Sequence, residues 1–374
     1  MKGQSQVASP SKQPPTKGRI LALDGMRGIA IILVLMSHGR WSLGFPDLSR
    51  LPFDGSQGVT FFLLLTGLMI TMLLLDEQEK HGEIALKAFY ARRALRLFPA
   101  YYTYLAVVAI LWAMRVVEVS PAGFIASAFH WRNIYTGPSG WVLHHTWSLS
   151  MQEQFYLVWP LLVARLPRKT VALIGVATIL LWPGIRFLRH GYLFPPSADA
   201  ALDAPGMETI LYGTLLAIAM RGGESLAILK RLGRGLWGLL LPPLIIGIVY
   251  KLIDFWPAQW TFLLAPIRNL AAVWLIWWCI SNHKHPAIRI LESPVLAWLA
   301  KLAYSLYLWQ QLFLGLNQGW ICYFPQNMVA VFVVAPLSYY LVEVPFNKLR
   351  DRIPLMARRP ASTSPPVATP ATSN

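Results

Sequence analysis

Apolar residues along this chain are gathered into ten runs, separated by short polar stretches. The runs are 20–38, 58–75, 98–119, 147–164, 170–188, 208–220, 236–253, 261–280, 294–316 and 327–346. A helix rises 1.5 Å per residue, so most runs are long enough to cross about 30 Å of hydrocarbon. The pattern predicts an all-α, polytopic membrane bundle of about ten transmembrane helices. The short run 208–220 and the Trp- and Phe-containing stretch 120–146 widen this count to between nine and twelve.

Both ends of the chain have a different character. Residues 1–19 and 354–374 are rich in Ser, Pro, Lys or Thr and poor in apolar groups, which predicts two disordered tails. The transmembrane domain is then expected over residues 20–353. No small-residue cleavage signature follows the first run, so we interpret it as a retained helix and not as a signal peptide.

Composition supports a membrane protein. Hydrophobic residues make up 55% of the 374 residues and charged residues only 13%, about half of the roughly 25% typical of globular domains. The mean hydropathy is +0.47. These values exclude a disordered chain and a disulfide-stapled secreted domain. The two cysteines, Cys279 and Cys322, lie far apart and indicate neither a disulfide framework nor a metal site.

The charge is strongly basic, with 33 Lys and Arg against 17 Asp and Glu and a net charge of +16. The cations are scattered between apolar runs and do not form one basic face, so no nucleic-acid partner is expected. With the N-terminus inside, 23 cations fall on the cytoplasmic side and 8 on the other side. This bias predicts that both termini are cytoplasmic.

Ionisable groups inside spans are costly and are therefore candidates for function. Arg27 and His38 lie eleven residues apart on the first run, which places them on one helix face and roughly 16 Å apart along the axis. A histidine can take a proton from a hydroxyl. The alternative is an interfacial His38 and an Arg27 that pairs with Asp24.

A second group of cations begins the third run. Arg93 and Arg96 are spaced i, i+3 on the expected helix, and two such guanidinium groups can hold phosphates through fork-shaped donors. Simple positive-inside anchoring is the alternative, although anchoring does not need this spacing.

The segment from Trp147 to Tyr156 brings polar groups to the outer end of the fourth run. Its carboxylate, Glu153, can orient an imidazole or accept a hydrogen bond from a substrate. His144 and His145 precede the segment. No second cluster with ligand spacing accompanies these histidines, so no metal is expected.

Six segments together resemble the acyltransferase-3 family of integral-membrane acyltransferases, over about residues 20–350. They are LDGMRGIAIILVLMSH (23–38), GVTFFLLLTGLMIT (58–71), RRALRLFPAYY (92–102), TWSLSMQEQFYLVWPLL (146–162), AYSLYLWQQ (303–311) and YYLVEVPF (339–346). The resemblance implies transfer of an acyl group, often acetyl, from cytoplasmic acyl-CoA to a hydroxyl of a glycan or glycolipid in a bacterial cell envelope. It also implies a multi-pass protein of the inner membrane that is in contact with lipid.

Site residues follow from the same resemblance. His38 is expected to act as the general base or as a covalent acyl carrier, Glu153 to orient it, and Arg27 to stabilise the thioester or its oxyanion. Arg93 and Arg96 are expected to hold the phosphates of CoA, which serves as donor substrate, with no bound cofactor. Four further residues are expected to contact substrate: Trp147, Ser148, Gln152 and Gln310.

Departures from the family pattern leave other functions open. Gln152 and Gln310 stand where the family usually has Glu and His, and an amide can neither act as a base nor change charge. Thr60 and Thr66 replace the usual Asp and Ser of the second run. A secondary transporter for a glycan, lipid or metabolite is one alternative, and a non-catalytic relative is another. The oligomeric state cannot be read from the sequence.

Overall fold

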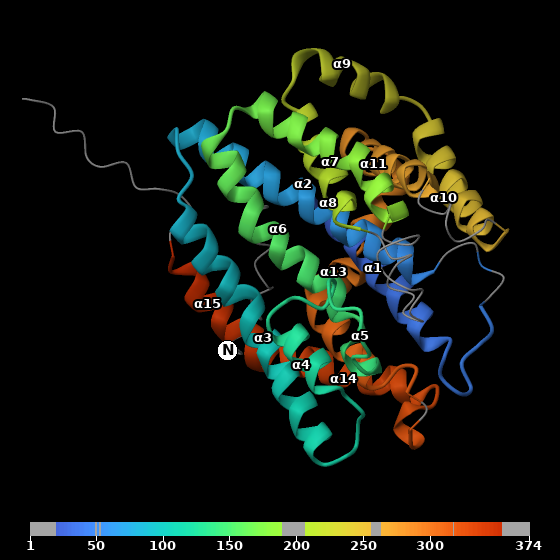
Figure 1. Ribbon diagram of the computed structural model, residues 1–374. Coiled ribbons are helices and arrows are strands. Elements are labelled where there is room, and N and C mark those ends of the chain that lie inside the picture. The colour runs from blue at the N-terminus through green and yellow to red at the C-terminus, as the bar shows by residue number, and fades with distance from the viewer. Residues whose placement is uncertain are drawn as a thin grey trace, which may run out of the picture.

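The computed structural model describes residues 20–48, 51, 54–188, 206–255, 263–316 and 318–353, and within these residues every regular element is helical. Figure 1 shows the helices packed side by side in one bundle. The larger helices are α1 (Leu21–Gly39), α2 (Gly55–His81), α3 (Leu86–Ala113), α6 (Thr146–Arg165), α7 (Arg168–Leu188), α8 (Met207–Ala219), α10 (Trp237–Phe255), α11 (Leu264–Ser281), α13 (Pro294–Trp309) and α14 (Gln326–Ser338). The shorter ones are α4 (Pro121–Ala128), α5 (Trp141–His144), α9 (Gly223–Leu232), α12 (Pro286–Leu291), η4 (Gln310–Leu312), η5 (Trp320–Cys322), η6 (Tyr339–Glu343) and α15 (Val344–Asp351).

Each of the ten apolar runs coincides with a helix, the last one with the continuous segment from α14 through α15. Among the described residues, six helices are long and apolar enough to cross a membrane: Leu21–Gly39, Gly55–His81, Leu86–Ala113, Arg168–Ile185, Leu264–Ser281 and Gln326–Asp351. Two shorter helices, Met207–Ala219 and Trp237–Leu252, are also apolar. The all-helical membrane architecture is therefore confirmed. The total of about ten spans stays a prediction, and the two expected tails lie outside the described residues.

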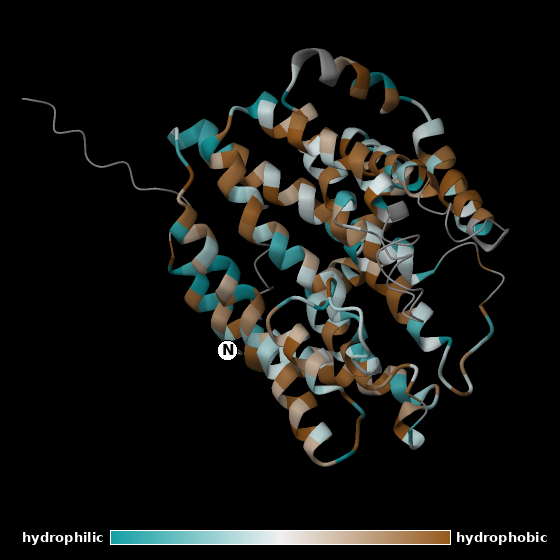
Figure 2. Ribbon diagram, viewed as in Figure 1, coloured by the Kyte–Doolittle hydropathy of each residue, from teal (hydrophilic) through white to brown (hydrophobic). Residues whose placement is uncertain are grey.

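The outside of the bundle carries large apolar side chains, as a lipid-facing surface requires. Ile110 on α3, Leu180 on α7 and Leu244 on α10 are all exposed, and Leu180 keeps 73% of its surface. Figure 2 shows hydrophobic residues along the helices and hydrophilic residues gathered at helix ends and connections. In a soluble bundle this apolar surface would be exposed to water, which is unfavourable for an apolar patch of this size.

Local sequence signals set several helix boundaries. The Asp54 side chain accepts a hydrogen bond from the backbone of Ser56 at 2.8 Å, and Gln57 completes a capping box at the start of α2. Ser120 and Ser293 cap α4 and α13, each followed by a proline at the first helical position. These starts are therefore readable from the sequence.

The stretch 120–146 forms α4, α5 and a connecting loop that cover one end of α3 and α6. The hydroxyl of Tyr101 donates to the carbonyl of Ser127 at 2.8 Å, and that of Tyr104 donates to the carbonyl of Val142 at 2.5 Å. Asn133 and Gln154 exchange side-chain hydrogen bonds at 2.9 Å. This stretch is thus tied to the bundle, with short helices and no long span.

Helix α2 lies at the centre and crosses α8 closely because two glycines meet there. A Cβ atom on Gly67 would lie 2.0 Å from the carbonyl oxygen of Ile210, and one on Gly213 would lie 1.9 Å from that of Leu64. Small residues let helix backbones approach where no hydrophobic force from water drives association. This crossing holds α2 against α8 and so supports the wall of the cavity described below.

Adding a methyl group at this crossing is expected to destabilise the protein. Gly67→Ala and Gly213→Ala must each push two backbones apart, which costs about 1–3 kcal/mol. We expect the thermal unfolding midpoint in detergent to fall for both variants. Gly184→Ala on α7 is the matched control, because nothing lies within 4 Å of its added Cβ. Equal midpoints for Gly67→Ala and Gly184→Ala would contradict this account of the crossing.

Candidate active site

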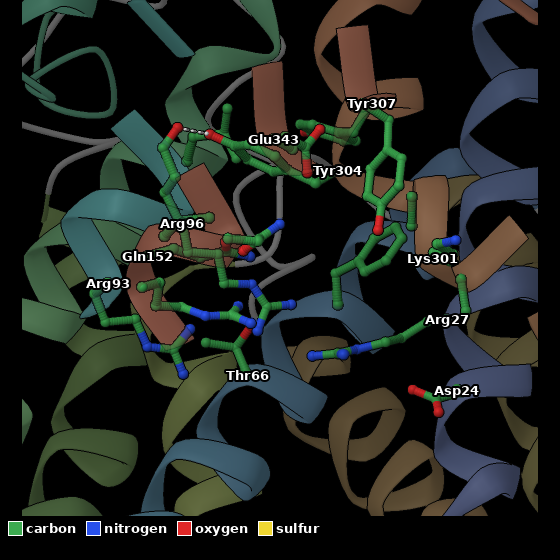
Figure 3. Close-up of a pocket in the computed structure, with 18 of the residues that line it drawn as sticks. Asp24, Arg27, Thr66, Arg93, Arg96, Gln152, Lys301, Tyr304, Tyr307 and Glu343 are labelled. Atoms are coloured by element: carbon green, nitrogen blue, oxygen red, sulfur yellow. Dashed lines mark hydrogen bonds between the residues drawn. The ribbon is translucent and has the colours of Figure 1, made fainter. Parts of the chain in front are cut away.

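A cavity of about 500 Å³ opens where α1, α2, α3, α6, α13 and the η6–α15 segment meet (Figure 3). Its lining is strongly cationic, with six basic and three acidic side chains. The basic residues are Arg27, Arg93, Arg96, Lys301, Lys348 and Arg350, and the acidic residues are Asp24, Glu343 and Asp351. The cavity therefore favours an anionic occupant.

Three arginines that the sequence singled out meet in this cavity. Arg93 and Arg96 extend from α3, and Arg27 reaches in from α1 on the opposite side (Figure 3). The guanidinium of Arg93 lies over the ring of Tyr156 at 4.7 Å, and this contact with α6 fixes its direction. Because arginines from two helices point into the same cavity, several guanidinium N–H donors surround it. Phosphate groups are bound by donors arranged in this way.

Arg92 has a different role, although it adjoins Arg93. Its Nη1 donates to the carbonyl oxygens of Arg350 at 3.1 Å and Ile353 at 2.6 Å. Successive residues of a helix differ by about 100° in direction, so neighbours face different partners. Arg92 ties the end of α15 to α3, whereas Arg93 faces the cavity.

The remaining wall is polar but mostly uncharged. Ser148 and Gln152 of α6, spaced i, i+4, both line the cavity, and Tyr304 and Tyr307 of α13 line it from another side. Glu343 accepts a hydrogen bond from the Ser305 hydroxyl, and its charge interacts with that of Arg96. Two of the four expected substrate contacts, Ser148 and Gln152, are thus in the cavity.

Glu153 corrects one expectation. It does not line the cavity, and the charge that acts on it is that of Arg93. His38 is instead acted on by His144, Arg40 and Asp54. His145, whose imidazole is acted on by the charge of His38, precedes Glu153 by eight residues, which is roughly 12 Å along α6. The expected contact between Glu153 and His38 is therefore not formed, and Glu153 belongs with the arginines.

Trp147 also differs from expectation. Its side chain is 9% exposed and belongs to the hydrophobic core, and it does not line the cavity. A tryptophan buries a large apolar area, and this position inside the bundle uses that area for packing. Trp147 therefore lies outside the arginine cavity, and a substrate contact at this residue stays a prediction.

His38 lies at the other end of α1 from Arg27, outside the cavity lining. Its ring packs edge-on against Trp141 at 5.8 Å between centroids, and the side chain of Gln310 lies nearby. His38 is half-buried, near the C-terminal end of α1. Gln310 is fully buried and belongs to this second cluster, not to the arginine cavity.

Two hydroxyls and a second histidine connect the cavity with the His38 region. Ser148 Oγ and the Tyr307 hydroxyl are 2.6 Å apart. The Tyr307 hydroxyl also donates to the carbonyl of His145 at 3.3 Å, and its ring lies 5.4 Å from the imidazole of that histidine. The sequence analysis assigned no role to Tyr307 or Gln311. The sequence offers one signal for them: Tyr307 and Gln311 are spaced i, i+4 within the segment 303–311, which would place both on one side of a helix.

No metal-binding cluster is found in the described part of the chain. There, no group of three or more His, Cys, Asp and Glu side chains is arranged to hold an ion.

Comparisons with known proteins place the chain in a family. A family model described as an acyltransferase domain matches residues 20–342. The peptidoglycan O-acetyltransferase OatA of Listeria monocytogenes is 27% identical over 365 residues, which cover 87% of this chain and 56% of that protein. The O-acetyltransferase OatA of Staphylococcus aureus (strain NCTC 8325) is 26% identical over 364 residues, with 87% and 57% covered. A provisionally named O-acetyltransferase of S. aureus (strain COL) is 27% identical over 371 residues, with 88% and 57% covered.

This chain thus spans little more than half the length of these curated relatives. No solved structure matches it.

Proposed function

Because this chain belongs to the acyltransferase-3 family, whose model matches residues 20–342, we propose that it is an integral-membrane O-acyltransferase. It moves an acyl group, acetyl in the simplest case, from acyl-CoA to a hydroxyl of a cell-envelope glycan or glycolipid. The names of the relatives support O-acetyl transfer, and one of them names peptidoglycan as its acceptor. The protein lies in the inner membrane with both termini in the cytoplasm.

One observation carries the donor assignment, namely the convergence of Arg27, Arg93 and Arg96 in a cavity of about 500 Å³. Coenzyme A is a polyanion, and ligand cavities of about 300–1,000 Å³ bury most of a ligand of drug size. Arginine binds phosphate through two parallel hydrogen bonds, which a lysine cannot form. The cavity is the site at which the phosphates of the donor bind.

The orientation of the bundle matches this assignment. Arg27 lies near the start of α1 and His38 at its end, so the donor cavity and the base are roughly 16 Å apart along the helix. The charge bias of the loops assigns the arginine end to the cytoplasm, where acyl-CoA is available. The acyl–pantetheine arm then extends from the cavity past Ser148 and Tyr307 toward the outer end.

The reaction proceeds by attack of the acceptor hydroxyl on the thioester carbonyl. His38 takes the hydroxyl proton, a C–O bond forms, and the C–S bond breaks to release CoA. Donors must stabilise the negative oxygen of the tetrahedral intermediate. The sequence-based expectation gave this role to Arg27, but Arg27 lines the cavity with Arg93 and Arg96, roughly 16 Å along α1 from His38, so we assign it to donor binding. Glu153 beside Arg93 limits repulsion within the arginine cluster and so positions the donor.

Purified protein in nanodiscs provides the test. We expect acetyl-CoA to raise the thermal unfolding midpoint and to release free thiol when a disaccharide fragment of peptidoglycan is supplied, with label from [acetyl-¹⁴C]acetyl-CoA entering the sugar. A transporter would bind its cargo without releasing CoA. A non-catalytic relative, which Gln152 and Gln310 leave open, would release no thiol with any acceptor. Either result would contradict the proposed function.

A further inference from the structure

His145, directly before α6, is a buried imidazole to which the proposed function assigns no role. Its side chain is 1% exposed, and its Nδ1 lies 2.6 Å from Oε1 of Gln311. The backbone N–H of His145 donates to the same oxygen at 2.8 Å. A backbone N–H can only donate, so this atom of Gln311 is the acceptor oxygen and Nδ1 of His145 carries a hydrogen. The other ring nitrogen, Nε2, therefore holds a bare lone pair.

In the described part of the chain no hydrogen bond of ordinary geometry reaches that nitrogen, although the backbone of Leu308 also acts on the imidazole. Nε2 of His145 is buried and has no partner there. A buried polar atom without a hydrogen bond costs about 1–3 kcal/mol. Because Gln311 holds the opposite edge of the ring, Nε2 keeps one direction. Such an atom fits a group that arrives only during the reaction.

The position of His145 lies between the two halves of the proposed reaction. On one side are Ser148 and Tyr307, which line the donor cavity and touch His145 through its carbonyl, at 3.1 Å from Ser148 Oγ and 3.3 Å from the Tyr307 hydroxyl. On the other side, the charges of His38 and His144 act on it. The ring of Tyr104 packs edge-on against the imidazole at 5.5 Å. His145 thus lies between the cavity residues Ser148 and Tyr307 on one side and His38 on the other.

Acyl transfer requires that a proton reach the sulfur of CoA near this position. The acceptor hydroxyl loses a proton at His38, while cleavage of the C–S bond leaves a thiolate inside the protein. A buried charge without a partner is costly, and a thiol has an ordinary pKa of about 8.5. The thiolate is therefore stabilised by receiving a proton before CoA leaves.

We propose that His145 is a second proton-transfer residue, which receives the acceptor's proton from His38 and delivers it to the sulfur of CoA. This inference rests on the proposed function. The O–H bond of the acceptor breaks, its proton passes from His38 to Nε2 of His145, and an S–H bond forms as the thiol leaves. The products are the ester and free CoA, and no other reactant is needed. Burial lowers the pKa of His145 to about 3, so the ring is neutral at rest and gives up an added proton readily.

The variant His145→Asn separates this role from a structural one. The asparagine side-chain nitrogen takes the place of Nδ1 and keeps the hydrogen bond to Gln311, whereas Nε2 is lost. We expect the thermal shift with acetyl-CoA to be unchanged and thiol release to the peptidoglycan disaccharide to fall about 100-fold or more, as for loss of a general acid. With a donor analogue whose thiol is made more acidic by fluorination beside the sulfur, the variant should regain at least tenfold relative to wild type.

Three results would overturn the inference. One is thiol release by His145→Asn within threefold of wild type. Another is that His145→Asn slows thiol release equally with acetyl-CoA and with the fluorinated analogue, because a structural defect does not depend on the leaving group. If His145→Asn does not fold, His145→Gln replaces it, and the same comparison of donors decides. Failure of the wild type to release thiol from acetyl-CoA would instead contradict the proposed function.

Discussion

Replacing His38 with alanine is expected to lower the rate of acetyl transfer by about 10²–10⁴-fold, the usual contribution of a general base. The dissociation constant for acetyl-CoA should change by less than about threefold, because His38 does not line the arginine cavity. The imidazole is half-buried beside Trp141 and Gln310, at the end of α1 where the proposed mechanism places the acceptor. In the proposed mechanism, His38 takes the proton directly from the acceptor hydroxyl.

Thiol release from acetyl-CoA measures the rate, and a thermal-shift titration measures binding. His283→Ala is the matched control, since His283 is exposed between α11 and α12 and has no place in the site. The prediction fails if His38→Ala retains more than a tenth of the wild-type rate. A loss of acetyl-CoA binding in His38→Ala would show instead that His38 supports the donor cavity.

The double variant Arg93→Ala/Arg96→Ala is expected to weaken acetyl-CoA binding by about 100-fold or more. A hydrogen bond to a charged group contributes about 1.5–3 kcal/mol, so each arginine accounts for roughly tenfold or more. Arg93 is held over Tyr156 and Arg96 interacts with Glu343, so both side chains are directed into the cavity before the donor arrives. Such preorganisation lowers the entropic cost of binding.

Binding is measured by thermal shift at several salt concentrations. The wild-type affinity should fall as salt rises, and the double variant should show a weaker dependence because fewer charges face the phosphates. Lys87→Ala is the control, an exposed cation on the same helix outside the cavity lining. Equal losses in Lys87→Ala and in the double variant would indicate a general effect of charge and contradict a specific phosphate site.

Several features of the protein were predictable from the sequence because they depend on local physics. A run of about twenty apolar residues satisfies its backbone hydrogen bonds only as a helix in lipid, and all ten predicted runs are helical. The capping residues Asp54 and Ser293 set helix starts within a few residues of themselves. Arg27 and His38 share one helix, so their separation follows from its rise.

Contacts between helices were less predictable. The sequence-based expectation joined Glu153 to His38 because both belong to polar segments near span ends, whereas Glu153 lies beside Arg93. Trp147 resembled a substrate contact and packs in the core. His145 is more than 160 residues from Tyr307 and Gln311 along the chain, and only packing brings it to them.

The sequence by itself therefore determined the helices, the membrane character, the family and five residues of the site, Arg27, Arg93, Arg96, Ser148 and Gln152, which the cavity brings together. The tertiary structure alone decided which face of each helix meets which neighbour. Adjacent residues of a helix point about 100° apart, so a small rotation of α3 or α6 exchanges a cavity residue for a packing residue. That rotation is set by contacts between elements, such as the hydrogen bond from Tyr101 of α3 to Ser127 and the stacking of Arg93 over Tyr156 of α6. These contacts join distant parts of the chain and leave no local signal.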